Sequence, residues 1–276
     1  MIMMASQEIT KNPWGTYGIS GWKKKWLTCC HAIKNRRLAL WARKPLKNAF
    51  REWADVEVWG LHLRLSPKGN LSEQRLLLMP QHLDSREREI LARELTGGGV
   101  FFDIGANAGV YSLWLASRKI AGLRIEAFEP DPTLCERLKF NLAENNLSSI
   151  TLNEHALGAE AGELVLARGE GNLGQNEIVA SGVGTKVAVK TLSQVLREKN
   201  IDKITALKID IEGYERIVLE SFFQETPFSV WPQLVICETL DGGVSTEGAK
   251  ALLAAGYEVD EHTRMNGIFR LKNPTP

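Results

Sequence analysis

The stretch FFDIGANAGVYSL, Phe101 to Leu113, combines an apolar run, a turn with two glycines and a second apolar run. This order predicts a strand, a sharp turn and a helix. Gly105 and Gly109 allow the backbone to approach a ligand closely, as it does where a nucleotide cofactor binds. A tight connection without a ligand would explain two glycines equally well, so other residues must decide between these interpretations.

The residues of the turn discriminate between cofactors. A dinucleotide site expects glycine at positions 105, 107 and 110, where this chain has Gly105, Asn107 and Val110. Side chains at the last two positions would meet the pyrophosphate of NAD or FAD, and no Gly-Lys-Ser/Thr phosphate loop follows. S-adenosylmethionine has no phosphate, and Asp103 and Asn107 could bind its methionine end.

Glu129 ends the next predicted strand, 20 residues after Gly109. A carboxylate at this place can accept hydrogen bonds from the hydroxyls of a ribose. It could instead be a solvated acid ahead of the turn EPDP. Together with the glycine turn, Glu129 favours a nucleoside-binding site.

A second group of charged residues lies in LKIDIEGYE. Lys208, Asp210 and Glu212 alternate, so on a strand they would share one face. Three charges cannot lie in an apolar core without a severe desolvation penalty, which favours a cleft at the end of the strand. The alternative is a buried network in which Lys208 pairs with Asp210. Glu238, which follows PQLVIC, could add a third carboxylate.

These carboxylates suit catalysis at a hydroxyl group. Methyl transfer from a sulfonium needs the acceptor close and in line, and a hydroxyl near neutral pH is a poor nucleophile without a positioned base. Asp210 and Glu212 are the candidate bases, with His155 as an alternative. A divalent metal that orients a diol is a further option, but no residue requires one and it is not favoured. The predicted catalytic residues are Asp210, Glu212 and Lys208.

From Val100 onward, predicted strands alternate with helices, which is typical of a doubly wound parallel sheet. Asn266-Gly267 lies between two alternating runs and predicts a final hairpin, so the sheet is expected to be mixed. Ligands in such sheets bind beyond the carboxyl ends of the strands. Most of the candidate residues follow predicted strands, so the fold would bring them together.

Four segments, FFDIGANAGVYSL, EAFEPDP, FNLAENNL and LKIDIEGYERIVLE, resemble the FkbM family of S-adenosylmethionine-dependent methyltransferases over residues 85–260. The resemblance implies a Rossmann-like class I methyltransferase fold, an α/β seven-stranded mixed sheet whose last strand is inserted antiparallel. It also implies O-methylation of a sugar or polyketide-type hydroxyl. Asn141 and Asn145 fit the family's Asn-x-x-x-Asn helix and are interpreted as structural caps.

By the same resemblance, the turn at 103–109 would line the methionine end of the cofactor and Glu129 would hold the ribose. His155, Ala156 and Leu157 would border the adenine. The expected cofactor-binding residues are Asp103, Gly105, Ala106, Asn107, Gly109, Glu129, Pro130, His155 and Ala156.

Residues 1–84 are expected to form an N-terminal extension, and residues 85–276 the cofactor-binding domain. The first 60 residues contain 11 Lys and Arg against 4 Asp and Glu, with six of the eight tryptophans. Residues 20–55 have a helical pattern that Pro45 interrupts, and VEVWGLHLRLSP predicts a strand with a bulge at Gly60. Helices packed over the domain are the favoured interpretation. The alternative is a helix at an anionic lipid surface, which would suit a lipid-linked glycan.

The composition of the whole chain excludes few functions. The 276 residues carry a net charge of +1, and 44% are hydrophobic, enough for a sizeable core. Four cysteines without a disulfide pattern, no signal peptide and no membrane-spanning run indicate a cytoplasmic protein, with peripheral membrane contact as a second option. No nucleic-acid reader motif accompanies the basic segment, so the expected partner is a small molecule or glycan.

Two other functions stay open at this point. One is a nicotinamide-dependent oxidoreductase on a related sheet, and the other is a binding module that keeps the fold without turnover. Gln81 and His82, just ahead of the sheet, could close over the cofactor or lie in a surface loop.

Overall fold

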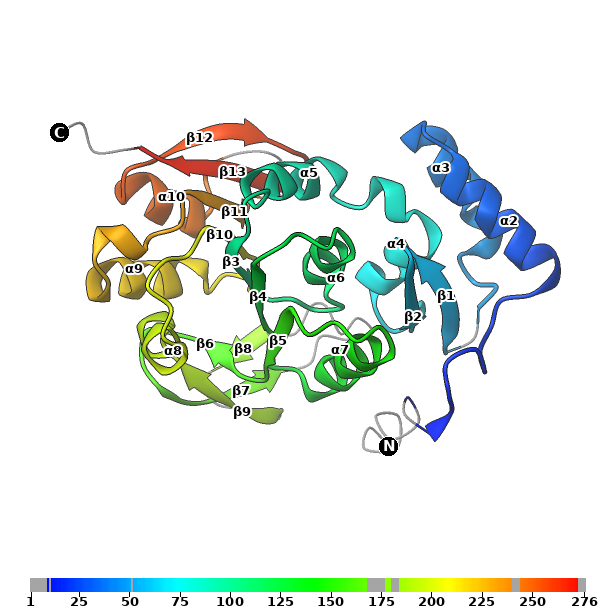
Figure 1. Ribbon diagram of the computed structural model, residues 1–276, viewed down its shortest axis with the longest axis horizontal. Coiled ribbons are helices and arrows are strands. Elements are labelled where there is room, and N and C mark those ends of the chain that lie inside the picture. Colours follow the sequence, from blue (N-terminus) through cyan, green and yellow to red (C-terminus); the bar gives the residue numbers. More distant parts are fainter. Residues whose placement is uncertain are drawn as a thin grey trace.

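The computed structural model describes residue 9 and residues 11–50, 52–167, 177–179, 184–239 and 244–272. Its centre is a seven-stranded sheet with the order β12-β13-β11-β10-β3-β4-β5 (Figure 1). Strand β13 lies antiparallel between β11 and β12, whereas β11, β10, β3, β4 and β5 run parallel. The expected α/β class I methyltransferase fold, with its inserted antiparallel strand, is therefore confirmed. The strands are β3 (Gly99–Ile104), β4 (Leu123–Phe128), β5 (Ile150–Asn153), β10 (Ala206–Ile209), β11 (Leu234–Glu238), β12 (Tyr257–His262) and β13 (Asn266–Leu271).

Helices cover both faces of this sheet (Figure 1). On one face lie α5 (Ser85–Glu94), α6 (Val110–Ser117) and α7 (Pro132–Glu144), and on the other α8 (Leu192–Lys199), α9 (Glu215–Glu225) and α10 (Glu247–Ala254). Successive strand residues point to opposite faces, so Phe101 joins the first hydrophobic core and Phe102 the second. A short 3₁₀ turn, η4 (Phe228–Val230), precedes β11.

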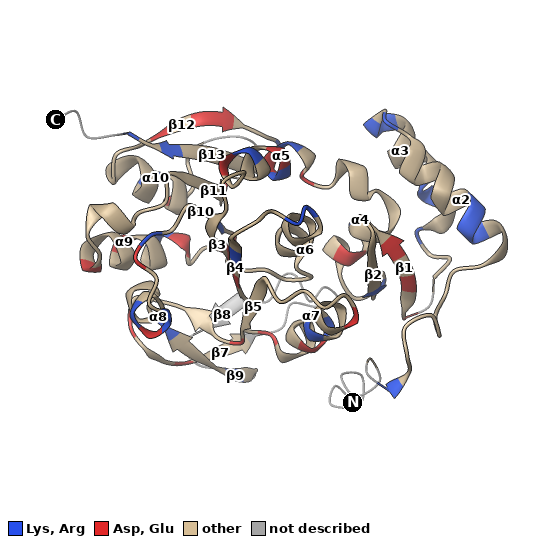
Figure 2. Cartoon of the chain, in the orientation of Figure 1, with Lys and Arg blue, Asp and Glu red and all other residues tan. Residues whose placement is uncertain are grey.

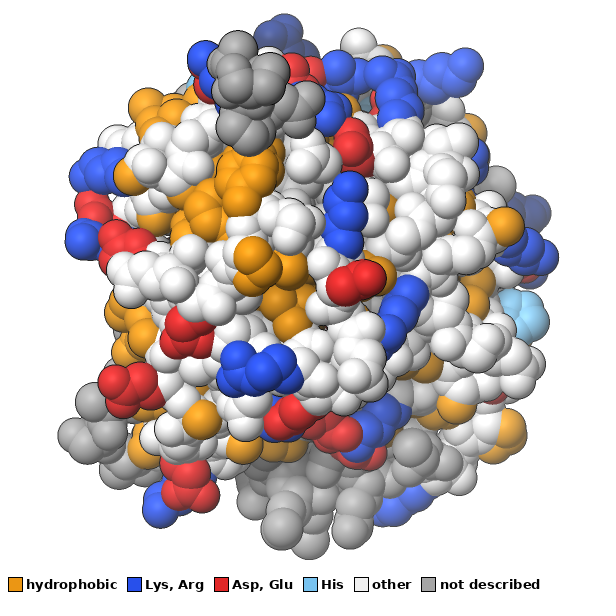
Figure 3. Space-filling model, turned by 60° about the vertical axis from the view of Figure 1, so that its left-hand side comes forward, with side chains coloured by type: hydrophobic (Ala, Val, Ile, Leu, Met, Phe, Trp, Pro, Cys, Tyr) orange, Lys and Arg blue, Asp and Glu red, His pale blue; other side chains and the backbone are white. Residues whose placement is uncertain are grey.

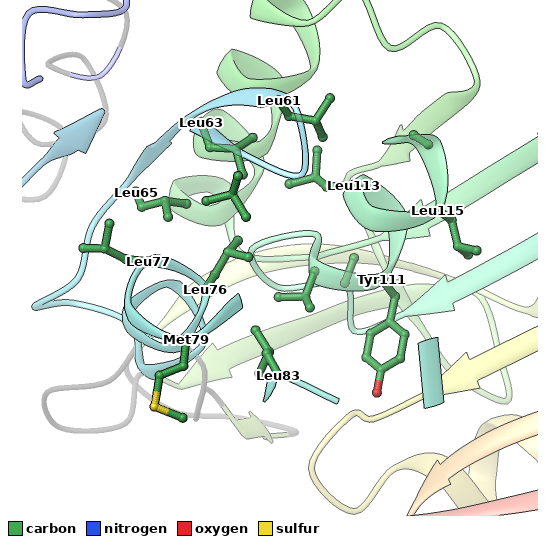
Figure 4. Close-up of a cluster of buried hydrophobic side chains, with 14 of the residues drawn as sticks. Leu61, Leu63, Leu65, Leu76, Leu77, Met79, Leu83, Tyr111, Leu113 and Leu115 are labelled. Atoms are coloured by element: carbon green, nitrogen blue, oxygen red, sulfur yellow. The ribbon is translucent and has the colours of Figure 1, made fainter. Parts of the chain in front are cut away.

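The N-terminal extension packs against the face that carries α6. It contains α2 (Gly21–Ala32), α3 (Arg36–Ala42), η1 (Lys44–Leu46), β1 (Ala54–Val58), β2 (Leu61–Leu65), α4 (Leu71–Leu78) and η2 (Pro80–His82). Figure 4 shows Leu63 of β2 and Leu76 of α4 in one buried cluster with Leu113 of α6. The extension therefore shares a hydrophobic core with the sheet.

Asn141 of α7 and Asn145, the C-cap residue of that helix, attach the extension to the domain. The side chain of Asn141 accepts a hydrogen bond from the Arg64 N–H (2.7 Å) and donates to the Arg64 carbonyl (3.2 Å). Asn145 makes the same pair of bonds with the backbone of His62. The two amides thus occupy the edge of β2 as a neighbouring strand would, which is a structural role.

The turn chemistry of the two hairpins differs from the sequence prediction. Strands β1 and β2 form an antiparallel hairpin whose turn residues, Trp59 (φ 57°) and Gly60 (φ 76°), are both left-handed. A single strand with a bulge was therefore the wrong interpretation, because Trp-Gly replaces the usual Asn-Gly of such turns.

At the C-terminal end the predicted hairpin is present, but Asn266-Gly267 starts β13 instead of forming the turn. Asn266 is held in the sheet because its side chain donates to Glu87 (3.0 Å).

A second, smaller sheet follows β5 in a glycine-rich part of the chain. Its strand order is β6-β9-β7-β8, with β6 (Ala156–Leu157), β7 (Gly162–Ala167), β8 (Glu177–Val179) and β9 (Thr185–Lys190). The rest of that glycine-rich stretch, 168–176 and 180–183, lies outside the described residues.

Candidate functional site

A cavity lies at the carboxyl ends of β3, β4, β10 and β11, with α4 and the start of α5 on its other side. It is where ligands bind in doubly wound sheets. Nine of the residues singled out in the sequence line it: Gly105, Ala106, Asn107, Glu129, Pro130, Lys208, Asp210, Glu212 and Glu238.

Asn107 has a specific structural role at the centre of the turn. Its backbone is left-handed (φ 50°), a conformation that asparagine tolerates better than most residues. Its N–H donates to Glu129 Oε2 (2.8 Å), and its side-chain oxygen accepts from the amide of Asn70 (2.5 Å). Asn70 also caps α4 by accepting from the N–H groups of Ser72 and Glu73. One residue therefore connects the turn, the ribose candidate and the N-terminal extension.

Gly105 is required by its neighbour Asp210, the residue that follows β10. Its φ is 71°, and a Cβ atom at this position would lie 1.9 Å from the carbonyl oxygen of Asp210. No side chain fits in that space without displacing backbone. The glycine therefore lets the turn after β3 cross closely over the end of β10.

Glu129 lines the cavity and is 6% exposed. Its two carboxyl oxygens accept the N–H groups of Asn107 (2.8 Å) and Asp131 (2.9 Å). Burial raises the pKa of Glu129 to about 7, although these two hydrogen bonds oppose the shift. A carboxylate has about four acceptor positions, so capacity remains for donors from the cavity.

Lys208 both pairs with Asp210 and lines the cavity, the two alternatives that the sequence left open. Its ammonium group donates to the carbonyl of Gly105 (2.8 Å) and lies 3.5 Å from Asp210 Oδ2. Burial lowers the pKa of Lys208, but the carboxylates of Asp210 and Asp103 outweigh it, so the net shift is upward. The lysine is thus a charged brace between β10 and the turn after β3, and it also faces the cavity.

Three carboxylates gather at the ends of β10 and β11. Strand β10 ends at Ile209, so Asp210 and Glu212 lie in the following turn, and the expected alternation along a strand is wrong there. Glu212 has left-handed backbone (φ 52°), and both residues nevertheless reach the same cavity as Lys208. Burial, together with repulsion from Asp210 and Glu212, raises the pKa of Glu238 to about 7.

Four of the expected residues do not line the cavity: Asp103, Gly109, His155 and Ala156. Asp103 is fully buried, and its Oδ2 accepts the hydroxyl of Ser112 (2.6 Å), which fixes the first turn of α6. The His155 ring packs edge-on against Phe128 (5.7 Å between centroids), and burial lowers its pKa. Ala156 is buried in the small sheet.

The cavity also contains residues that the sequence pattern did not indicate. Ser72 and Arg75 come from α4, whose approach to the turn at 105–107 depends on tertiary contacts. Asp84 is left-handed (φ 45°) and accepts a hydrogen bond from the Tyr111 hydroxyl, while burial raises the pKa of Asp84. A non-glycine residue in this conformation is a common feature of binding sites, but it cannot be recognised from sequence.

Gln81 and His82 lie elsewhere. The Gln81 amide donates to the carbonyls of Cys30 (2.8 Å) and Ile33 (3.0 Å), and the His82 ring bonds to the Ile33 carbonyl (2.8 Å). Both residues therefore secure the end of α2. Within the part of the chain that the structure describes, no group of three or more His, Cys, Asp or Glu is arranged to hold a metal.

Comparison with known sequences identifies the family. The sequence model of the methyltransferase FkbM domain matches residues 103–259, more than half of the chain. The chain belongs to the FkbM methyltransferase domain family. The matched region contains the turn after β3, Glu129 and the carboxylates at the ends of β10 and β11.

The individual proteins that the chain resembles share less than a third of the aligned residues with it. The chain is 31% identical over 156 residues to methyltransferase sdnD of Sordaria araneosa, an alignment of 45% of this chain and 60% of that protein. It is 28% identical over 201 residues to 31-O-demethyl-FK506 methyltransferase FkbM of Streptomyces tacrolimicus, covering 60% and 75% of the two chains. A solved structure, methyltransferase FkbM from Methylobacillus flagellatus, aligns with a TM-score of 0.40 at 18% identity, over 72% of this chain and 54% of that one.

Proposed function

We propose that this chain is an S-adenosylmethionine-dependent O-methyltransferase that acts on a hydroxyl of a sugar, glycan or secondary metabolite. The observation that carries the proposal is the buried Glu129 carboxylate, which faces the cavity beside a glycine turn. Family membership supports methyl transfer. The printed name of the Streptomyces relative describes a methyltransferase for an O-demethyl compound, which supports oxygen as the acceptor atom.

The charge of the cavity favours this cofactor over a dinucleotide. Five carboxylates and two cations give the lining a formal charge of −3 when all are ionised. A sulfonium cation is attracted to such a site, whereas the two phosphates of NAD would be repelled. The charged lining residues are Asp84, Glu129, Asp210, Glu212, Glu238, Arg75 and Lys208.

S-adenosylmethionine would supply the electrophilic methyl group. The side chains of the cavity would bind this cofactor and position the acceptor. Glu129 would accept the ribose hydroxyls, and the turn at 105–107 would border the methionine end. Lys208 keeps that turn in place through the Gly105 carbonyl. This leaves the ends of β10 and β11 for the acceptor.

We infer that Glu238, which lines the cavity beside Asp210 and Glu212, is the base for the acceptor hydroxyl. A general base works best when its pKa lies near the working pH, and the pKa of Glu238 is about 7. Asp210, beside Lys208, would orient the acceptor. The turn residue Glu212 lines the same end of the cavity.

Isothermal calorimetry with S-adenosylhomocysteine and with NAD tests the cofactor. We expect binding of the first and none of the second, and Glu129→Ala should weaken the first severely. Tight binding of NAD alone would instead support the oxidoreductase. Transfer of label from tritiated S-adenosylmethionine to hydroxylated acceptors separates an enzyme from a binding module, because a module would bind without transfer.

A further inference from the structure

The outer side of α2 and α3 exposes large hydrophobic side chains. Four of the ten most exposed large hydrophobic residues in the described part of the chain lie on these two helices. They are Trp22 (58% exposed), Trp26 (39%), Leu38 (59%) and Trp41 (66%). We call these four residues and the lysines and arginines around them the α2–α3 surface.

The exposed tryptophans of α2 lie on successive turns of the helix. Trp22 and Trp26 are four residues apart, so their side chains are neighbours, and the stripe they begin becomes buried one turn later at Cys30. The Trp26 indole donates to the Ala42 carbonyl (2.7 Å), which fixes α2 against the end of α3. The aromatic groups are therefore presented by a rigid pair of helices, which lies at the outer edge of the molecule (Figure 1).

The inner side of this pair is anchored. The His31 ring bonds to the Leu77 carbonyl of α4 (2.7 Å), and Lys23 donates to the Ala49 carbonyl (2.6 Å). Leu27, Cys30 and Ala39 lie in the main hydrophobic core. Because these contacts already hold the helices, the exposed side chains of Trp22 and Trp41 are not needed to dock the extension.

The charge of the α2–α3 surface has one sign. Residues 11–50 contain ten Lys and Arg and no Asp or Glu. Figure 2 shows basic and no acidic residues on α2 and α3. By contrast, the face that Figure 3 brings forward, toward the left-hand side of Figure 1, mixes acidic and basic side chains. The exposed cations on the two helices include Lys24, Lys25, Arg36 and Arg37.

We propose that the α2–α3 surface docks on an anionic lipid membrane. Indole rings partition to the boundary between headgroups and acyl chains, and lysine and arginine are attracted to anionic headgroups. Nucleic acid would satisfy the cations, but it offers no apolar phase for Leu38, which is the reason to prefer lipid. No described helix is long and apolar enough to cross a bilayer, so the contact is peripheral. The inference does not depend on the proposed methyl transfer.

Sedimentation of the full chain with vesicles tests this proposal. We expect binding to vesicles of phosphatidylcholine with phosphatidylserine, weak binding to phosphatidylcholine alone, and release by salt. The double variant Lys24→Glu with Lys25→Glu should weaken binding on the order of 1,000-fold, since about 1 kcal/mol is gained per cation near an anionic surface and reversing two charges changes the charge by about four units. Lys203→Glu, which reverses one exposed lysine far along the chain, is the control and should bind like the parent.

The tryptophans need a separate test. Trp22→Ala with Trp41→Ala should weaken vesicle binding at least about tenfold, whereas Ile217→Ala, which removes a 44% exposed side chain from α9, should not. Unchanged melting temperatures would show that the variants fold. Equal binding to both vesicle types, retained binding by both double variants, or binding of a short RNA duplex in place of the vesicles would overturn the proposal.

Discussion

The titration of Glu129 offers a quantitative test of the cofactor site. Burial raises the pKa of this carboxyl to about 7, whereas ribose hydroxyls would bind its ionised form. Affinity for S-adenosylhomocysteine should therefore be constant well above pH 7 and fall about tenfold for each pH unit below it. Because the ligand favours the ionised form, binding near pH 7 should release a proton.

Glu129→Gln should remove this pH dependence and weaken binding. Both carboxyl oxygens accept backbone N–H groups, from Asn107 and Asp131, and an amide nitrogen cannot accept. One of these N–H groups would lose its partner, which lowers fold stability by about 1–3 kcal/mol with or without ligand, and the ribose would lose a charged acceptor worth about 1.5–3 kcal/mol. We expect the second effect alone to reduce affinity, by about 10- to 100-fold.

Calorimetry on both sides of pH 7 measures these effects, and the glutamine variant corrects for titration of the ligand itself. Glu136→Gln, a partly exposed position on α7, is the matched control and should behave like the parent. A flat profile in the parent chain would refute the reasoning. So would a steep profile that survives in Glu129→Gln.

The other predictions concern the turn and the base. Gly105→Ala should lower the free energy of unfolding by roughly 3 kcal/mol or more in urea melts, because its Cβ would lie 1.9 Å from a carbonyl oxygen; Gly122→Ala, with the same φ of 71° but open space, should cost much less. Asn107→Ala should be destabilising by about 1–3 kcal/mol and Asn107→Gly by less, since glycine tolerates the left-handed backbone; equal losses would contradict this. Glu238→Gln should lower kcat on the order of 100-fold without changing affinity for S-adenosylhomocysteine, and should abolish a limb of the rate profile near pH 7. An unchanged rate would exclude Glu238 as the base.

The sheet could be predicted from sequence because its strands and helices have strong, local periodicity. The strand and helix pattern from Val100 onward also placed Glu129, Lys208 and Asp210 at the same edge, as the structure shows. Asn107 was recognised as unusual for a dinucleotide site, but its bond to Asn70 joins residues far apart in the chain. Such a contact leaves no periodic signal.

Features that depend on tertiary contacts could not be predicted. The backbone N–H of Asn266 donates to the Thr263 hydroxyl, and the Asn266 side chain donates to Glu87. These two bonds hold the Asn-Gly pair in β13 instead of in the turn. Arg75 lines the cavity only because α4 packs over the turn at 105–107. The exposure of Trp41 likewise follows from which side of α3 is anchored.

A crystal structure of the chain with S-adenosylhomocysteine would test the central claim most directly. We predict that the ribose hydroxyls lie within hydrogen-bonding distance of the Glu129 carboxylate, with the homocysteine end against the turn at 105–107. A ligand bound outside this cavity, or bound in it with the ribose turned away from Glu129, would contradict the assignment.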